Sequence, residues 1–358
     1  MKLIDHPDNP VPEGARAGFV ETPDGVRIRY AHWPASGRER RGTVTLVQGR
    51  AEFIEKYFEV IEDLRRRGFA VVTFDWRGQG GSQRLTRNPK RGHISNFRKY
   101  RLDLRTVLKE ISLANYPGPH FCPGPLDRRS GAPIRQPKAQ DDAGPGGDHL
   151  AAARPAFGRM GAEPCRFRPQ VPAESHFRPA RAAAAESRRA QDLSASRKTS
   201  AFPPPASFRC SAWAGFFIPG GNAEIFIPFE TNRQTSDRIR FDRFNKVLKQ
   251  APELGVGAPT IGWLNAAART MLALRRRDAG PNMKLPCLVL AAGNDRIVST
   301  PETEDFVSRT KAAAYVEIPG AAHELMMERD IFRDQFWAAF DAFVPGAEAE
   351  QELERARI

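Results

Sequence analysis

Apolar and polar positions in the first third of the chain follow the periods of strands and of helices in turn. Residues 18–33, GFVETPDGVRIRYAHW, place alternating apolar residues around Pro23-Asp24-Gly25, which favours a tight turn, so a β-hairpin is predicted. The short β-branched runs TVTLVQ (43–48) and AVVTFD (70–75) are typical of strands buried in a parallel sheet. Between them the apolar residues recur at helical spacing: Ile54, Tyr57, Ile61 and Leu64. The order strand, helix, strand predicts an α/β protein.

The same kind of pattern continues to residue 120 and resumes near residue 212. A helix with one apolar face is predicted from Phe97 to Ile111, and the next buried strand should begin near His120. Residues 241–248, FDRFNKVL, predict a helix that starts after Ser236-Asp237. Two buried strands, each running into a loop, are predicted in residues 287–299 (CLVLAAGNDRIVS) and 314–324 (AYVEIPGAAHE). The last predicted helix carries four phenylalanines: Phe332, Phe336, Phe340 and Phe343.

Residues 121–212 break this pattern. They contain 13 of the chain's 30 prolines and only five Leu, Ile or Val residues. So few branched aliphatic residues cannot offset the entropy of ordering the backbone, and so many prolines interrupt both helices and sheets. The segment is therefore predicted to be disordered. Because a structureless stretch of this length is unusual inside a compact domain, it indicates an anomaly in the sequence itself.

The basic charge of the chain is concentrated in this anomalous segment. The net charge of +13 would ordinarily suggest nucleic acid or an anionic membrane as a partner. Residues 121–212 hold 15 basic and 8 acidic residues and so contribute +7 of that charge. Since most of the excess comes from this one segment, nucleic acid is not expected as a partner.

The sequence shows no pattern typical of a membrane span, a secretory signal or paired cysteines. The sequence has no run near the roughly 18 apolar residues that span a bilayer, and its first residues lack the apolar core of a secretory signal, so a cytoplasmic protein is expected. The cysteines show neither the spacing of a zinc site nor that of a disulfide framework, which predicts reduced thiols. They are Cys122, Cys165, Cys210 and Cys287.

Two polar residues, Asp295 and His323, each lie just past the end of a predicted buried strand. An α/β hydrolase supplies the acid and the base of its catalytic triad from such positions, in the chain order nucleophile, acid, base. A serine hydroxyl becomes a strong nucleophile when an imidazole takes its proton, and the carboxylate fixes the imidazole tautomer and stabilises the imidazolium. The pair therefore indicates the acid and base of a serine hydrolase.

Two other motifs are less specific than this aspartate–histidine pair. His323-Glu324 could begin an H-E-x-x-H zinc helix, but Met327 stands at the second histidine position, so no metal site is predicted. The glycines of DWRGQGGS (75–82) match no nucleotide-binding fingerprint, and a tight turn after a strand is predicted there. No cofactor is expected.

Several separate motifs, in the right order, resemble the α/β-hydrolase group that includes bacterial lysophospholipase L2 and the monoacylglycerol lipase-like serine hydrolases. The similarity covers roughly residues 15–120 and 213–345. The motifs are LVQGRAEFIEKY (46–57), FDWRGQGGS (74–82), RNPKRGHISNF (87–97), GNDRIVS (293–299) and PGAAHE (319–324), and residues 219–244 resemble the helical lid that this group inserts over its sheet.

The resemblance implies a role for specific residues and a division of the chain. Asp295 would be the triad acid and His323 the general base, while the turn Gly49-Arg50 would supply a backbone N–H to the oxyanion hole. Gln48 stands where many relatives have histidine, which leaves backbone donors unaffected. The expected fold is an α/β-hydrolase, a mostly parallel sheet flanked by helices. Its core halves would be residues 1–121 and 276–345, separated by the anomalous segment 122–212 and a lid-like helical insertion 213–275, with a charged tail 346–358.

The nucleophile is missing where this family should show it. A G-x-S-x-G elbow should follow the strand that begins at His120, and the sequence contains none. Ser130, the nearest hydroxyl, lacks the small neighbours that a strained turn requires. One allowed coding of Pro123–Ser130, read one nucleotide later, gives Leu-Ala-His-Ser-Ile-Gly-Gly, an elbow of the missing kind. The hypothesis for the whole segment is therefore a frameshift, with the reading frame restored by a compensating change near residues 210–216. The alternative is a real insertion that replaced the elbow.

The expected ancestral function is hydrolysis of a carboxylic ester in a small amphiphilic substrate, such as a lysophospholipid or a monoacylglycerol, with peripheral contact at the inner membrane face. As written, the chain should be inactive and poorly folded. Two alternatives remain. The first is a non-catalytic basic binding protein that contacts nucleic acid or anionic lipid through residues 121–212. The second is another serine chemistry, such as peptide or thioester cleavage, because a fold does not fix function.

Overall fold

A computed structural model describes residues 2–37, 39–124, 213–283 and 285–344 of the 358-residue chain. Ser130 and nearly all of the anomalous segment 122–212 therefore lie outside the described residues, as does the charged tail. The predicted disorder of that segment stays a prediction.

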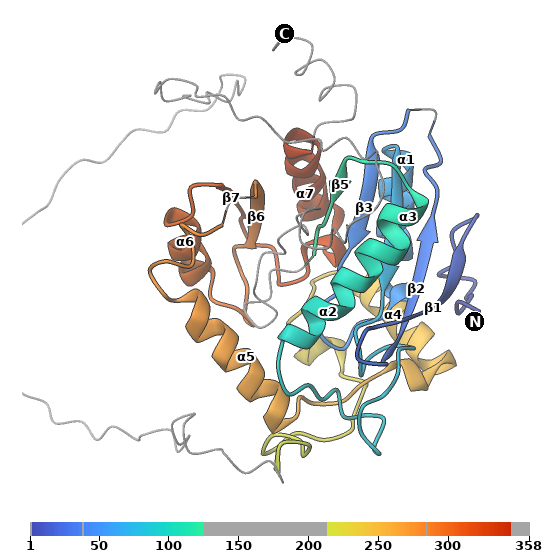
Figure 1. The fold of residues 1–358 in the computed structure, drawn as a ribbon, viewed down its shortest axis with the longest axis vertical. Helices are drawn as coiled ribbons and strands as arrows, with labels where there is room; N and C mark the ends of the chain where they lie inside the picture. The colour runs from blue at the N-terminus through green and yellow to red at the C-terminus, as the bar shows by residue number, and fades with distance from the viewer. Residues whose placement is uncertain (1, 38, 125–212, 284, 345–358) are drawn as a thin grey trace, which may run out of the picture. The chain divides into compact units, whose positions relative to one another are not determined.

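The predicted hairpin and parallel unit form one mixed five-stranded sheet in the order β1-β2-β4-β3-β5 (Figure 1). Strands β1 and β2 pair antiparallel around a turn in which Gly25 has a φ of 75°, and β2 also pairs antiparallel with β4. Strands β3, β4 and β5 run parallel. The bounds are β1 Arg16–Glu21, β2 Arg27–Trp33, β3 Gly42–Leu46, β4 Phe69–Phe74 and β5 His120–Phe121.

Helices cover both faces of this sheet because side chains of its buried strands point alternately to opposite sides. Val71 of β4 packs in one core cluster with α1 and α7, whereas the next residue, Val72, packs in a second cluster with α2 and α5. Every residue of β3 and β4 is buried. The helices are α1 Phe58–Arg66, α2 Arg98–Val107, α3 Leu113–Asn115, α5 Ile261–Leu274 and α7 Asp330–Phe343; the 3₁₀ helix η1, Ile54–Tyr57, precedes α1, and the π-helical turn η2, Leu108–Ser112, links α2 to α3.

The last two predicted strands form a parallel pair of their own among the described residues. They are β6, Cys287–Ala292, and β7, Ala313–Ile318, with α6, Thr300–Ser308, between them. Ala292 and Ile318 share a core cluster with β3, β4 and α1, and α7 contributes Phe336, Trp337 and Phe340 to it. The two sheets therefore pack around one apolar core.

The region expected to resemble a lid contains the helix α4, Arg238–Gln250, and two short 3₁₀ helices, η5, Phe229–Thr231, and η6, Pro252–Leu254. The predicted start of α4 is confirmed, because the Asp237 side chain accepts a hydrogen bond from the Arg240 backbone N–H at 2.8 Å. Phe241, Val247 and Leu248 bury one face of the helix. A last 3₁₀ helix, η7, Leu325–Met327, precedes α7.

Candidate functional site

The loops that follow β6 and β7 lie side by side and carry the two residues singled out by the sequence. The Gly293 N–H donates to the Ile318 carbonyl at 3.0 Å, and the Asn294 N–H donates to the Ala321 carbonyl at 2.9 Å. These cross-links extend the parallel pairing beyond the strands. They bring Asp295, in the first loop, close to His323, in the second.

Asp295 and His323 form a hydrogen-bonded pair. Nδ1 of His323 lies 2.7 Å from Oδ2 of Asp295, whose side chain is only 4% exposed. The other carboxylate oxygen accepts the backbone N–H groups of Ile297 and Val298 at 2.7 and 2.9 Å. Burial alone would raise the pKa of Asp295, but the hydrogen bonds from His323 and the backbone outweigh it and hold that pKa below its ordinary value. An ionised Asp295 accepts a hydrogen bond from the Nδ1–H of His323, which keeps the proton on Nδ1, so Nε2 is the ring atom that can act as a base.

The loop of His323 is fixed from a second side by a fully buried carboxylate, Glu328. One of its oxygens accepts the Ala322 N–H at 2.8 Å, and the other accepts the Ser236 hydroxyl at 2.6 Å. The Glu324 N–H donates to the Gln234 carbonyl at 2.8 Å. The segment before α4 is thus joined to the loop that carries the base.

The turn predicted to hold the oxyanion donors follows β3. The Gly49 N–H donates to the Glu52 carboxylate, so this donor is already engaged within the turn. The Arg50 guanidinium donates to the Gly257 carbonyl at 2.6 Å and lies over the Trp263 ring. The assignment of Gly49 and Arg50 to an oxyanion hole stays a prediction.

Neighbouring side chains hold this turn in a strained conformation. Ala51 has a φ of 64°, in the left-handed region that non-glycine residues rarely adopt. Its N–H donates to Oε1 of Gln79 at 2.6 Å, and Nε2 of Gln79 donates to the Tyr100 hydroxyl at 3.1 Å. The Trp76 indole N–H donates to the Gln48 carbonyl at 2.7 Å. The glycine-rich stretch 75–82 is the tight turn that the sequence predicts, with φ values of 78° at Gly78 and 50° at Gly80, and it supports the turn after β3.

The strand expected to lead into the nucleophile is present but short. His120 and Phe121 pair with Thr43 and Val44 of β3, and the Val47 N–H donates to the Pro123 carbonyl at 2.9 Å. The described part of this strand ends beside the turn at Gly49, which is where a nucleophile would have to follow. The nearest hydroxyl considered above, Ser130, lies outside the described residues.

Sequence reasoning singled out Asp295, His323 and the turn at Gly49, but it missed the side chains that lie between them. Glu52, Lys56 and Glu324 form a largely buried charged cluster between the turn at Gly49 and the loop of His323. Their type and spacing are those of exposed helical residues, so only a pattern of charged residues beside two expected active-site loops could have pointed to them.

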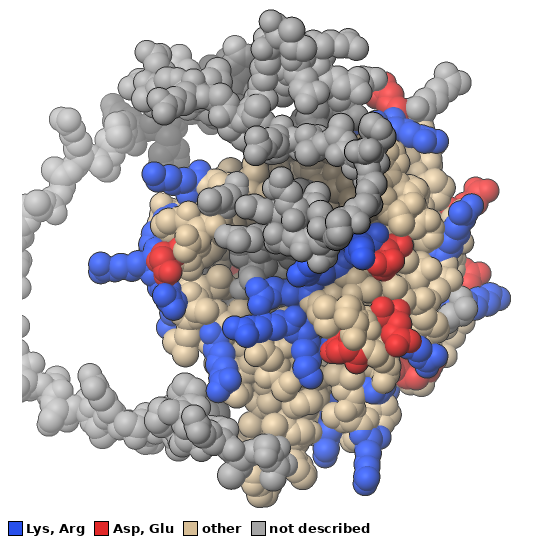
Figure 2. All heavy atoms as spheres, in the orientation of Figure 1, with Lys and Arg blue, Asp and Glu red and all other residues tan. Residues whose placement is uncertain are grey.

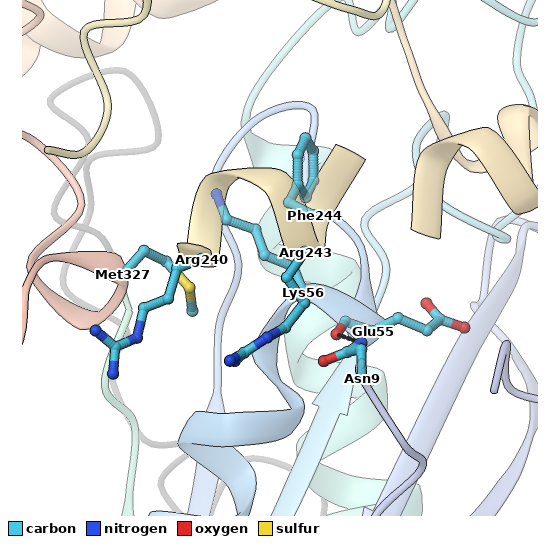
Figure 3. A pocket seen from close by; sticks show the side chains of 7 residues that line it. All are labelled: Asn9, Glu55, Lys56, Arg240, Arg243, Phe244 and Met327. Atoms are coloured by element: carbon cyan, nitrogen blue, oxygen red, sulfur yellow. Dashed lines mark hydrogen bonds between the residues drawn. The ribbon is translucent and has the colours of Figure 1, made fainter. Parts of the chain in front are cut away.

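A small pocket lies between Asn9, η1 and α4, and Lys56 of this cluster is part of its lining (Figure 3). Its basic side chains already hold carboxylates, since Arg240 and Arg243 both bind Glu59. The pocket includes neither Asp295 nor His323. It is therefore not the candidate active site.

A mixed sheet flanked by helices, with a hydrogen-bonded aspartate and histidine after two neighbouring parallel strands, is the arrangement of an α/β-hydrolase. The sequence profile of the serine aminopeptidase S33 family matches residues 38–124 and 192–330, more than half of the chain. The chain belongs to this family of α/β-hydrolases. The matched ranges leave out residues 125–191, which directly follow the short β5.

Relatives and structural neighbours agree with this assignment. Lysophospholipase L2 of Escherichia coli strain K12 is 29% identical over 322 residues, covering 87% of this chain and 82% of the relative. A probable lysophospholipase L2 of Haemophilus influenzae is 24% identical over 313 residues, covering 86% and 85%. A crystal structure of a soluble variant of monoglyceride lipase from Saccharomyces cerevisiae, in complex with a substrate analogue, has a TM-score of 0.56 at 15% identity over 92% of this chain and 95% of that chain. The chain is thus a lysophospholipase-like α/β-hydrolase.

The described helices give no sign of a membrane span. None of those in the four described ranges combines the length and the apolar character needed to cross a bilayer.

Proposed function

We propose that this chain descends from a serine hydrolase that cleaves the carboxylic ester of a small amphiphile, and that the polypeptide as written lacks the nucleophile and is inactive. The observation that carries the proposal is the 2.7 Å hydrogen bond between His323 and Asp295 at the ends of two neighbouring strands. This pair is the acid–base half of a triad.

The chemistry would proceed through an acyl-enzyme. Nε2 of His323 would take the proton of a serine hydroxyl as the oxygen attacks the ester carbonyl, and Asp295 would stabilise the imidazolium. A backbone N–H of the turn Gly49-Arg50 would stabilise the negative charge that develops on the carbonyl oxygen. His323 would return the proton to the leaving alcohol, and water would then release the acid. The sequence offers no serine in an elbow for the first of these steps.

The substrate class follows from the relatives. Two of them are named as lysophospholipases, and the structural neighbour is a monoglyceride lipase. A lysophospholipid or a monoacylglycerol is the proposed substrate, since both present one acyl ester on a small polar alcohol. The proposed location is the cytoplasm, with peripheral contact at the inner membrane face. No cofactor is proposed, because the triad chemistry needs none.

Resequencing the gene from the codon of Tyr116 to that of Gly220 tests the missing nucleophile first. If an extra base is removed and Ala-His-Ser-Ile-Gly-Gly appears in frame, the corrected enzyme should hydrolyse lysophospholipid or monoacylglycerol in a serine-dependent manner. The chain as written should show no such turnover. Serine-dependent hydrolysis by the chain as written would overturn the proposal of inactivity, and an inert corrected chain would overturn the proposed ester hydrolase.

The non-catalytic alternative is supported by one surface. Helix α2 exposes Arg98, Arg101 and Arg105, and basic side chains gather where Figure 2 draws this part of the molecule. Binding of an anionic vesicle or of nucleic acid should then weaken steeply with salt, as counterion release requires, and should lose most of its strength when residues 121–212 are deleted, leaving only what the α2 arginines contribute. Binding that is absent or insensitive to salt would remove this alternative.

A further inference from the structure

Three buried charged side chains connect the turn at Gly49 with the loop of His323. Nζ of Lys56 donates to Oε1 of Glu52 at 2.9 Å and to Oε1 of Glu324 at 2.6 Å. The side chains of Lys56, Glu52 and Glu324 are only 5%, 7% and 12% exposed. Glu324 directly follows His323, and Glu52 accepts the Gly49 N–H. One ammonium group therefore bridges the two parts of the candidate site.

Further contacts hold Glu52 and Lys56 in place. Glu52 also accepts the Tyr57 hydroxyl at 2.7 Å. Nζ of Lys56 lies 5.1 Å from the centroid of the Phe244 ring on α4, and both residues are labelled in Figure 3. Phe244 in turn stacks on Phe53, with 5.0 Å between the ring centroids. A cation over an aromatic face is attracted by the ring's negative surface. Lys56 is thus in contact with the turn, the base loop and α4 together.

The charge of the cluster shows why Lys56 matters. Two carboxylates and one ammonium group would leave one buried negative charge, which is costly unless a proton or further donors compensate it. Burial, together with the neighbouring Glu52, raises the pKa of Glu324 above its ordinary value. Burial acts in the same direction on Glu52, but Lys56 and the Tyr57 hydroxyl outweigh it and lower the pKa of Glu52. Without Lys56, both carboxylates would lose their shared donor and repel each other.

We propose that Lys56 is a positioning residue of the hydrolase site: by binding Glu52 and Glu324 at once, it holds the oxyanion turn and the loop of the general base in fixed mutual register. This inference rests on the proposed function. Lys56 does not touch the reacting atoms in this proposal. It acts through Glu324 on the adjacent His323, and through Glu52 on the turn.

The test uses the full chain as it exists and needs no turnover. The Nδ1 proton of His323, shared with Asp295, should give a low-field proton NMR resonance, assigned by its loss in Asp295→Asn and in His323→Gln. Lys56→Met should abolish this resonance, and Lys56→Arg, which restores a bridging cation, should retain it.

A second variant and a matched control keep the test decisive. Because Lys56→Met leaves two buried carboxylates without their cation and could unfold the chain, the double variant Lys56→Met with Glu324→Met replaces the ion pair by apolar side chains, which is often tolerated. It should fold and still lose the resonance. The control is Arg77→Met, which removes a 1% exposed cation between Asp24 and Asp103 and should keep the resonance.

The outcomes are distinguishable. Persistence of the resonance in both Lys56 variants, or its loss in Arg77→Met as well, would overturn the positioning role and leave the proposed function intact. Absence of the resonance from the unmodified chain would show that the acid and base do not pair in solution, which would overturn the proposed function and this inference with it.

Discussion

At the ends of β6 and β7, two loops cross-link each other and hold Asp295 and His323 in contact, whereas β5 pairs with β3 over two residues and then enters the anomalous segment. The first region depends on contacts within residues 287–328 and on Gln234, Ser236 and the turn at Gly49. The difference between the two regions is that the contacts around the Asp295–His323 pair lie among described residues, whereas the chain that follows β5 lies outside them.

The largest effect is expected when the nucleophile is restored and the general base is then removed. In the frame-corrected chain, His323→Ala should reduce kcat by about 10⁴- to 10⁶-fold, because the serine hydroxyl then has no proton acceptor. Hydrolysis of an aryl ester measures this loss. In the chain as written the same substitution should change nothing, and a drop in turnover there would reveal an unrecognised nucleophile.

Removing only the triad acid should have the next largest effect. Asp295→Asn in the frame-corrected chain should lower kcat by about 10⁴-fold, since the amide favours the wrong tautomer of His323 while preserving the geometry. The measurement is kcat at neutral pH with circular dichroism as a check on folding. Full activity in a folded Asp295→Asn variant would contradict the assignment of the acid.

Helix α7 shares a core cluster with both sheets, so a large side chain of this helix tests how much the shared core stabilises the fold. Phe340 is 6% exposed and packs edge-on against Phe69 of β4 at 5.8 Å, as well as against Trp337. Phe340→Ala should reduce the free energy of unfolding by about 3–5 kcal/mol through lost burial and a cavity. Denaturant unfolding measures it, with the exposed Ile331→Ala as a control that should cost little. A small effect at Phe340 would mean that the sheets do not share one core.

The smallest effect concerns the attachment of α4. Glu59 binds Arg240 at 2.7 Å and Arg243 at 2.6 Å. Burial opposes ionisation, but these arginines and Arg333 lower the pKa of Glu59 from 4.5 to about 2. Because the folded pKa is the lower one, the stabilisation is complete above about pH 4.5 and is lost as the pH falls towards 2.

Glu59→Gln should therefore lower stability at neutral pH and flatten its decline between pH 4.5 and 2. Thermal unfolding across this range measures the change, with Asp242→Asn, an exposed partner of Arg238 on the same helix, as the control. An unchanged pH dependence in Glu59→Gln would remove the role assigned to this carboxylate.

The sequence predicted what depends on local patterns. The β-branched runs at 43–48 and 70–75 became β3 and β4, the turn at Gly25 closed the hairpin, and the two polar residues after buried strands met as a pair. Each of these features follows from a short window of residues.

Buried charges could not be predicted in this way. In the alternating stretch RIRY, Arg29 falls at a polar position, yet it is fully buried between Glu55 and Asp75. Glu52 and Lys56 have the i, i+4 spacing of an exposed helical ion pair, but Glu324, far along the chain, completes and buries the cluster. Whether such a charged side chain is buried depends on which distant carboxylate it contacts in the folded chain. Hydrophobic periodicity describes only neighbouring residues and cannot predict that contact.

The central claim is that this chain holds an assembled acid and base without a nucleophile. The most direct measurement is treatment of the purified full-length chain with a fluorophosphonate probe, followed by mass-spectrometric mapping of any labelled residue. No serine should be labelled in the unmodified chain. A serine labelled in the unmodified chain, but not in His323→Ala or Asp295→Asn, would contradict it and identify the nucleophile.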